Sequence, residues 1–262
     1  MTFLAGNLLS AFFAVLGACI GSFLNVCIYR ISEGKSIIFP NSFCPNCQHP
    51  IKLYDNIPIV SYLVLRGRCR NCHERISLRY PALELLTALL SLLLFWKYGF
   101  SFQYLFAFVF TCALIVIAFI DLEHQIIPDV ITLPGIPLFF LLTFFFTGVS
   151  FCDSILGILI GGGSFYLIAV VYQLVTKREG MGGGDIKLIA MLGAFLGWKS
   201  LLFILIVSSF LGAIVGISMM IIHGKDLKYA VPFGPFLSIA AVAYIFFGDY
   251  FMKFLILRQG IY

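Results

Sequence analysis

Two aspartates occupy the ends of long apolar stretches of this sequence. Asp121 follows a charge-free run over 102–120, and Asp185 stands between the glycines of GMGGG and a second apolar run. Ionisable groups that border a bilayer are costly and usually face the interior of a helix bundle or a cavity. Two carboxylates in one such cavity cannot both ionise easily, so one stays protonated, and the pair can activate a water molecule while polarising a carbonyl. The two residues therefore predict aspartyl protease chemistry.

The residues around the two aspartates also allow plainer interpretations. Gly182 and Gly184 can let a substrate backbone approach Asp185 closely, because glycine lacks a side chain and tolerates positive φ. Asp185 can instead be a helix cap or a first-turn charge, and Asp121 a loop residue. Three neighbours have equally plain explanations as solvated-turn or helix-start residues: Glu123, His124 and Asp129.

Four cysteines have the spacing of a zinc site. They form the pairs CPNC and CRNC, separated by 21 residues: Cys44, Cys47, Cys69 and Cys72. Each pair closes a tight turn onto one metal ion, and two pairs complete the four ligands of tetrahedral zinc. Two disulfides are the alternative, which a cytoplasmic location disfavours because cytosolic thiols stay reduced. Two histidines beside the pairs are expected at the surface, although either can replace a ligand: His49 and His73.

The composition is that of an integral membrane protein. Of the 262 residues, 61% are hydrophobic and 11% are charged, and the mean hydropathy is +1.04, whereas soluble domains carry roughly a quarter charged residues. No Lys or Arg precedes Arg30, so the basic start of a secretory signal peptide is not found, and a retained first helix is expected. A helix needs about 20 apolar residues to cross a bilayer. The segment 188–198 is shorter and can span only if it begins at the glycines. With it, eight spans are expected: 1–29, 81–100, 102–120, 130–152, 154–176, 188–198, 200–222 and 229–248.

The distribution of positive charge predicts the orientation of these spans. With eight spans, 13 of the 17 Lys and Arg residues fall on one side, which the positive-inside rule makes the cytoplasm, with both termini outside. Membrane topology thus explains the net charge of +5 without nucleic acid as a partner. The expected fold is an all-α polytopic membrane protein with a small zinc-stabilised cytoplasmic insert between helices 1 and 2. Its expected parts are a first transmembrane helix (1–29), the four-cysteine insert (30–80), a seven-helix membrane bundle with the protease site (81–250) and a C-terminal tail (251–262).

Several motifs together resemble the bacterial type IV prepilin peptidase family. The GGGD of residues 182–185 fits the G-x-G-D motif of intramembrane aspartyl proteases, which alone is a weak signal. The wider resemblance covers most of the chain, and its joint spacing makes it specific. It runs through GSFLNVCIYR (21–30), the CxxC insert, DNIPIVSYL (55–63), RYPALE (79–84), DLEHQIIPD (121–129), GMGGGDIKL (180–188) and VPFGPFL (231–237). One departure is Ile31-Ser32, where the family often has a proline.

The resemblance implies a bifunctional enzyme of the bacterial inner membrane, with Asp121 and Asp185 as its catalytic aspartates. Such an enzyme removes a short basic leader, after a glycine, from type IV prepilins or type II secretion pseudopilins at the cytoplasmic face. It then methylates the new N-terminal residue with S-adenosylmethionine. Methyl transfer rests on the resemblance alone, since no glycine-rich Rossmann signature follows a strand. Its residues are expected in the insert and near Glu84, with none assigned individually.

Two other functions remain open from the sequence. One is a different GxGD protease of the signal-peptide-peptidase or presenilin type, against which the CxxC insert, VPFGPFL and the 64-residue separation of the aspartates argue. The other is a non-enzymatic cation transporter that uses the membrane aspartates, with a regulatory zinc insert. Cleavage of a pilin that carries a basic leader distinguishes all three.

Overall fold

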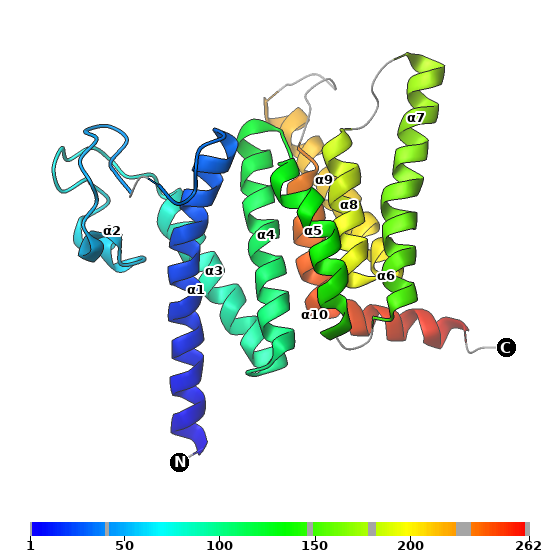
Figure 1. The fold of residues 1–262 in the computed structure, drawn as a ribbon, viewed down its shortest axis with the longest axis horizontal. Helices are drawn as coiled ribbons and strands as arrows, with labels where there is room; N and C mark the ends of the chain where they lie inside the picture. Colours follow the sequence, from blue (N-terminus) through cyan, green and yellow to red (C-terminus); the bar gives the residue numbers. More distant parts are fainter. Residues whose placement is uncertain (1, 40–41, 146–148, 178–181, 224–231, 260–262) are drawn as a thin grey trace. The chain divides into compact units, whose positions relative to one another are not determined.

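The computed structural model is mainly helical, and it describes all residues except 1, 40–41, 146–148, 178–181, 224–231 and 260–262. Within these residues the extended pairing consists of two isolated β-bridges. The helices in chain order, with 3-10 and π segments marked η, are α1 (Thr2–Ser32), η1 (Leu53–Asn56), α2 (Val60–Val64), α3 (Arg79–Tyr98), α4 (Phe102–His124), α5 (Asp129–Leu142), η2 (Thr143–Phe145), α6 (Phe151–Ile158), η3 (Leu159–Ser164), α7 (Phe165–Thr176), α8 (Gly183–Leu196), α9 (Trp198–His223) and α10 (Gly234–Gln259) (Figure 1).

The expectation of an all-α polytopic membrane protein is confirmed, and each of the eight expected spans corresponds to a helical segment. Six of these segments in the described part of the chain are long and apolar enough to cross a membrane. The other two, α5 and α8, have 14 residues each, fewer than the roughly 20 that a bilayer requires. The helix expected over 130–152 is shorter in the structure. There α5 ends at Leu142, η2 follows to Phe145, and α6 begins at Phe151.

The chain divides into two compact units, Met1–Cys112 and Ala113–Tyr262. In the first unit, α1 packs along α3. Two glycines four residues apart allow the close approach. A Cβ on Gly17 would lie 2.6 Å from the Cβ of Ser91, and one on Gly21 would lie 2.8 Å from the Cα of Glu84. Small residues at this spacing let the backbones of membrane helices approach, which here brings Glu84 against α1.

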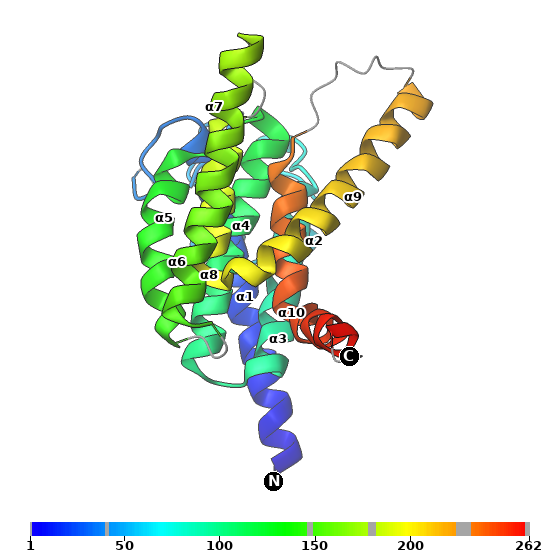
Figure 2. The same cartoon turned by 90° about the vertical axis from the view of Figure 1, so that its right-hand side faces the viewer.

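In the second unit, α8 is the enclosed helix. It contacts α5, α6, α9 and α10, and every residue from Leu188 to Leu196 is buried. Gly157 of α6 faces Gly193 of α8 so closely that a Cβ on either would collide with the backbone of the other. Figure 2 shows α8 among the neighbouring helices of this unit, with α9 running obliquely to them. The start of α8, where Asp185 lies, is therefore held by protein contacts along the rest of the helix.

Candidate active site and metal centre

Asp121 lies in the last turn of α4 with its carboxylate turned inward. Its side chain is buried, with 5% of the residue surface exposed. The backbone N–H of Gly234, the first residue of α10, donates a hydrogen bond to Asp121 Oδ2 at 2.9 Å. The first N–H groups of a helix have no partner within the helix and carry its positive dipole end. The beginning of α10 therefore supplies a donor to this carboxylate.

Asp185 lies in the first turn of α8, directly after the glycines. Asp185 and Asp121 line one cavity of about 400 Å³. Gly182 and Gly184 line the same cavity. The structure thus brings together the two aspartates and two glycines singled out in the sequence, with Phe233 joining them from a third segment.

The two glycines have different surroundings in this cavity. A Cβ on Gly184 would lie 2.8 Å from the Cβ of Ile127, so Gly184 allows the turn after α4 to pack against the start of α8. A Cβ on Gly182 would lie 3.4 Å from Asp185 Oδ2, which leaves the approach to that carboxylate open. Gly182 thus remains a candidate for substrate approach, whereas the immediate neighbour of Gly184 is Ile127. Residues 178–181 of the same loop lie outside the described residues.

Asp129 makes an ion pair that the sequence did not suggest. It lies in the first turn of α5, as expected for a helix-start residue, and Lys187 Nζ of α8 lies 2.7 and 2.8 Å from its two carboxylate oxygens. The pair is partly solvated and contributes about 1 kcal/mol or less to stability. It nevertheless ties the start of α5 to the start of α8, two residues beyond Ile127 and Asp185, which line the cavity. Glu123 and His124 are exposed at the end of α4.

The four cysteines of the insert have the geometry of a tetrahedral metal site. Their sulfur atoms all lie within 4.8 Å of one another, and the sulfurs of Cys44 and Cys72 are 3.9 Å apart. Zinc–sulfur bonds of about 2.3 Å in a tetrahedron place the sulfurs about 3.8 Å apart, so the cluster fits a zinc ion. All eight cysteines of the chain are free. His49 and His73 are exposed and lie outside the cluster.

The two cysteine pairs lie on two copies of the same turn. In each copy the first cysteine N–H bonds the carbonyl five residues later (Cys44 to His49, 3.0 Å; Cys69 to Glu74, 2.8 Å), and its carbonyl accepts from the residue four later. A β-bridge closes each turn, from Phe43 to Pro50 and from Arg68 to Arg75. The fourth residue after the first cysteine has positive φ in both copies: Gln48 at 57° and His73 at 59°. Each pair is thus prepared to offer two sulfurs to a shared ion.

Hydrogen bonds to the sulfurs favour their ionised form. The backbone N–H of His49 and the side-chain amide of Asn71 lower the pKa of Cys47 to about 6. The backbone N–H groups of Cys72 and Asn71 lower the pKa of Cys69. Burial works in the opposite direction at Cys44, where it raises the pKa to about 11. Zinc binds thiolates, and donors aimed at sulfur are part of what a structural site requires.

Comparison with known proteins yields two adjoining family matches. Residues 15–98 match the bacterial peptidase A24 N-terminal domain, and residues 108–217 match the type IV leader peptidase family. A prepilin leader peptidase/N-methyltransferase of Pseudomonas putida is 38% identical over 257 residues, covering 90% of this chain and 89% of that protein. The chain belongs to the type IV leader peptidase family. Proteins of the same name from Neisseria gonorrhoeae (40% identical, 87% of this chain and 86% of that protein) and Myxococcus xanthus (44% identical, 84% and 66%) are also similar. No solved structure gives a significant match.

The family matches divide the chain much as the structure does. The N-terminal match contains the four cysteines and the leader peptidase match contains both aspartates. Gly234, which donates to Asp121, lies beyond the second match. In the sequence, VPFGPFL contributed to the resemblance but had no role assigned. A glycine at the start of an apolar helix was the available signal, although its N–H could not be assigned to Asp121 without the fold.

Glu84 has partners that the sequence did not reveal. It is buried in α3, with 7% of its surface exposed. Its Oε2 accepts a hydrogen bond from the backbone N–H of Ile59 at 2.7 Å, and the hydroxyl of Ser22 also bonds the carboxylate. Ile59 has φ of 62°, an unusual conformation for a β-branched residue. Glu84 therefore fastens the stretch before α2 to α1 and α3.

Proposed function

We propose that this protein is an aspartyl endopeptidase that removes the short basic leader of type IV prepilins or type II secretion pseudopilins, and then methylates the new N-terminal residue. The observation that carries the hydrolytic half is the cavity into which α4, α8 and the start of α10 direct Asp121, Asp185 and the N–H of Gly234. The names of the similar proteins support both halves.

The geometry suggests different roles for the two carboxyl groups. A backbone N–H that bonds a carboxylate stabilises its ionised form, and Gly234 provides such a donor to Asp121 alone among the described contacts. In the proposed mechanism Asp121 is therefore the charged member, which accepts a proton from the attacking water. Asp185 holds the shared proton and donates it to the carbonyl oxygen of the scissile bond. As the tetrahedral intermediate collapses, Asp121 gives the proton taken from water to the leaving amine, and Asp185 recovers a proton from a hydroxyl of the intermediate, which restores the starting pair.

The amine released by cleavage is the acceptor in the second half of the proposal. When bound, S-adenosylmethionine supplies an electrophilic methyl group: the amine lone pair forms the N–C bond, the C–S electron pair returns to sulfur, and a proton leaves to solvent. The reaction needs donor and amine to be aligned and needs no shared proton. The aspartates are therefore assigned to hydrolysis only.

Zinc is proposed as the structural ion of the insert. Four thiolates close its coordination shell, which leaves no position for water or substrate, so the ion holds the two turns together and takes no part in hydrolysis. The insert and the aspartate cavity are proposed to face the cytoplasm of the inner membrane. The positive-inside distribution of Lys and Arg supports this orientation, and reducing conditions there keep the cysteines available for zinc.

The test is cleavage of a purified pilin that carries a basic leader, by the full-length protein in detergent with S-adenosylmethionine. We expect mass analysis to find the leader removed after a glycine and one methyl group on the new N-terminus. An intact substrate after incubation with folded, zinc-loaded protein would contradict the peptidase assignment. Cleavage without methylation would contradict only the second half.

A further inference from the structure

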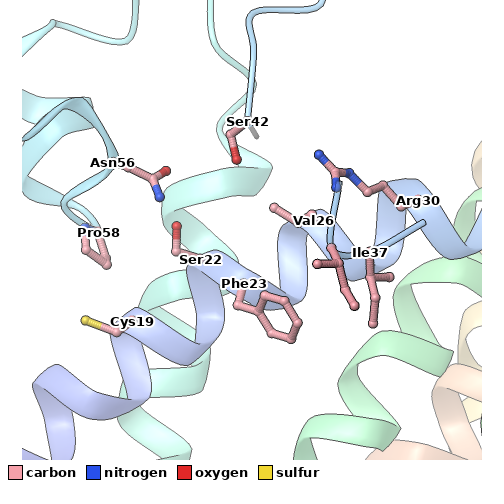
Figure 3. Close-up of a pocket in the computed structure, with 10 residues that line it drawn as sticks. Cys19, Ser22, Phe23, Val26, Arg30, Ile37, Ser42, Asn56 and Pro58 are labelled. Carbon is pink, nitrogen blue, oxygen red and sulfur yellow. The ribbon is translucent and has the colours of Figure 1, made fainter. Parts of the chain in front are cut away.

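A second cavity lies in the first unit, far in sequence from the two aspartates. It has a volume of about 560 Å³ and is formed by α1 and two stretches of the insert. Figure 3 shows the side chains gathered around it. Five of them come from one face of α1, at the three- and four-residue spacing of a helix surface: Cys19, Ser22, Phe23, Val26 and Arg30. The insert contributes Ile37, Ser42 and Asn56 among others.

We propose that this cavity between α1 and the insert binds the methyl donor S-adenosylmethionine. The inference rests on the proposed methyltransferase function and assigns residues to it. The volume lies within the roughly 300–1,000 Å³ typical of sites for small molecules, which are mostly apolar with a few polar groups that fix orientation. The lining of this cavity has that character, with apolar side chains, two hydroxyls, one amide and one guanidinium.

Arg30 is the group that selects a carboxylate. Its side chain reaches the cavity although only 6% of the residue surface is exposed. It is held in place by a hydrogen bond from Nη1 to the carbonyl of Ser36 at 3.1 Å. A planar guanidinium matches a carboxylate with two parallel hydrogen bonds, which are strong where water is excluded. The carboxylate of the methionine part of the donor is the complementary group.

Phe23 and Asn56 match the other end of the donor. Phe23 is half-exposed, at 48%, and presents a ring to the cavity, where a flat heterocycle such as adenine can stack. The side-chain amide of Asn56 offers both donors and an acceptor, the combination that adenine recognition uses. Ser42 offers a hydroxyl that suits the ribose, and the oxygen of Ser22, whose O–H bonds Glu84, can accept from a ribose hydroxyl.

The walls of the cavity are held by contacts outside it. Glu84 accepts from the N–H of Ile59 and so fixes the stretch that carries Asn56 and Pro58. Asp55, beside Asn56, forms an ion pair of 2.6 Å with Arg70, which lies between the cysteines of the second pair. On the other wall lies Ser42, two residues before Cys44. Its carbonyl accepts a hydrogen bond from the N–H of Ile51 at 2.9 Å. Both insert walls are thus fastened to the cysteine turns, so loss of zinc is expected to loosen the cavity.

The experiment measures binding of S-adenosylmethionine to the full-length protein in detergent by equilibrium dialysis, with leader cleavage measured in the same preparations. We expect Arg30→Gln and Phe23→Leu each to weaken binding at least tenfold. Matched controls are Arg75→Gln, on an exposed part of the insert, and Phe12→Leu, on the exposed surface of α1 outside the cavity. Asn56→Leu, in an exposed stretch that is expected to tolerate the change, should also weaken binding. All five variants should retain leader cleavage.

Crosslinking of the bound methyl donor gives a second readout. Ultraviolet crosslinking of labelled S-adenosylmethionine, followed by peptide mapping, should mark peptides that contain Phe23 or Asn56. Wild-type binding that survives unchanged in Arg30→Gln, Phe23→Leu and Asn56→Leu would overturn the assignment of the cavity, as would a label confined to the second unit, while the proposed function would stand. A wild-type protein that cleaves the leader but binds no S-adenosylmethionine would overturn the methyltransferase proposal itself.

Discussion

Gly234 is the position at which one added carbon atom should disable hydrolysis. Its N–H bonds Asp121 Oδ2 at 2.9 Å, and a Cβ built on it would lie 2.7 Å from the same oxygen, 3.2 Å from the carboxylate carbon and 3.3 Å from Ile127 Cδ1. Non-bonded contacts to carbon are most favourable at about 3.5–4.0 Å. In Gly234→Ala the carboxylate must therefore move by roughly 1 Å or lose its hydrogen bond.

A displacement of this size in a catalytic group lowers rates by about 100-fold, which corresponds to about 2.7 kcal/mol in activation free energy. We expect the loss in kcat for leader cleavage, with KM little changed, because the substitution alters the acid–base pair and leaves the remaining surface in place. The assay is steady-state cleavage of a purified prepilin in detergent.

The control is Gly216→Ala in α9, where an added Cβ would meet nothing within 4 Å and alanine favours the helix. It should cleave at the wild-type rate. S-adenosylmethionine binding should be unchanged in both variants, which reports on folding of the first unit. Cleavage by Gly234→Ala within threefold of wild type would refute the role assigned to the start of α10.

Three further results are expected. Asp121→Asn and Asp185→Asn should each lower cleavage of a prepilin at least 1,000-fold, because the two carboxyls act as a unit; substantial activity in either would refute the pair. Lys187→Met and Asp129→Asn should each lower cleavage only severalfold and to the same extent, since each breaks the same partly solvated ion pair. Unequal losses would point to a separate role for one of the two residues. Elemental analysis should find about one zinc per chain, and Cys69→Ser should lose this zinc. Cys69→Ser should also impair methylation of a peptide with a free N-terminal Phe more than it impairs leader cleavage. Asp185→Asn, by contrast, should retain that methylation.

The helices were predictable because a membrane span is visible in the sequence as an unbroken run of apolar residues, whose recognition requires no long-range contact. The same reasoning overestimated the length of α5. Its apolar run continues to Cys152, yet the α-helix ends at Leu142. The prediction was too long because hydrophobicity alone does not reveal where a helix stops. Two prolines within it, Pro134 and Pro137, gave no clear end signal.

The metal cluster and the two aspartates were predictable for another reason. CxxC spacing is a local geometric requirement, and carboxylates are so costly beside lipid that their presence is informative. The partners of these groups could not be predicted. The bond from Gly234 to Asp121 joins residues 113 apart in the chain, and the pair of Lys187 and Asp129 joins residues 58 apart. Both depend on which helix ends meet, a property of packing that no local pattern contains.

The enclosure of α8 has a consequence for how deep the chemistry occurs. At about 1.5 Å per residue, its 14 residues span about 21 Å, well short of the roughly 30 Å hydrocarbon core. A helix in contact with lipid would respond to this mismatch by tilting or by thinning the bilayer. Since residues from Leu188 to Leu196 touch protein instead, the depth of Asp185 is fixed by neighbouring helices. The position of the cut in a substrate should therefore stay the same in thin and thick bilayers, even where the rate of substrate entry changes.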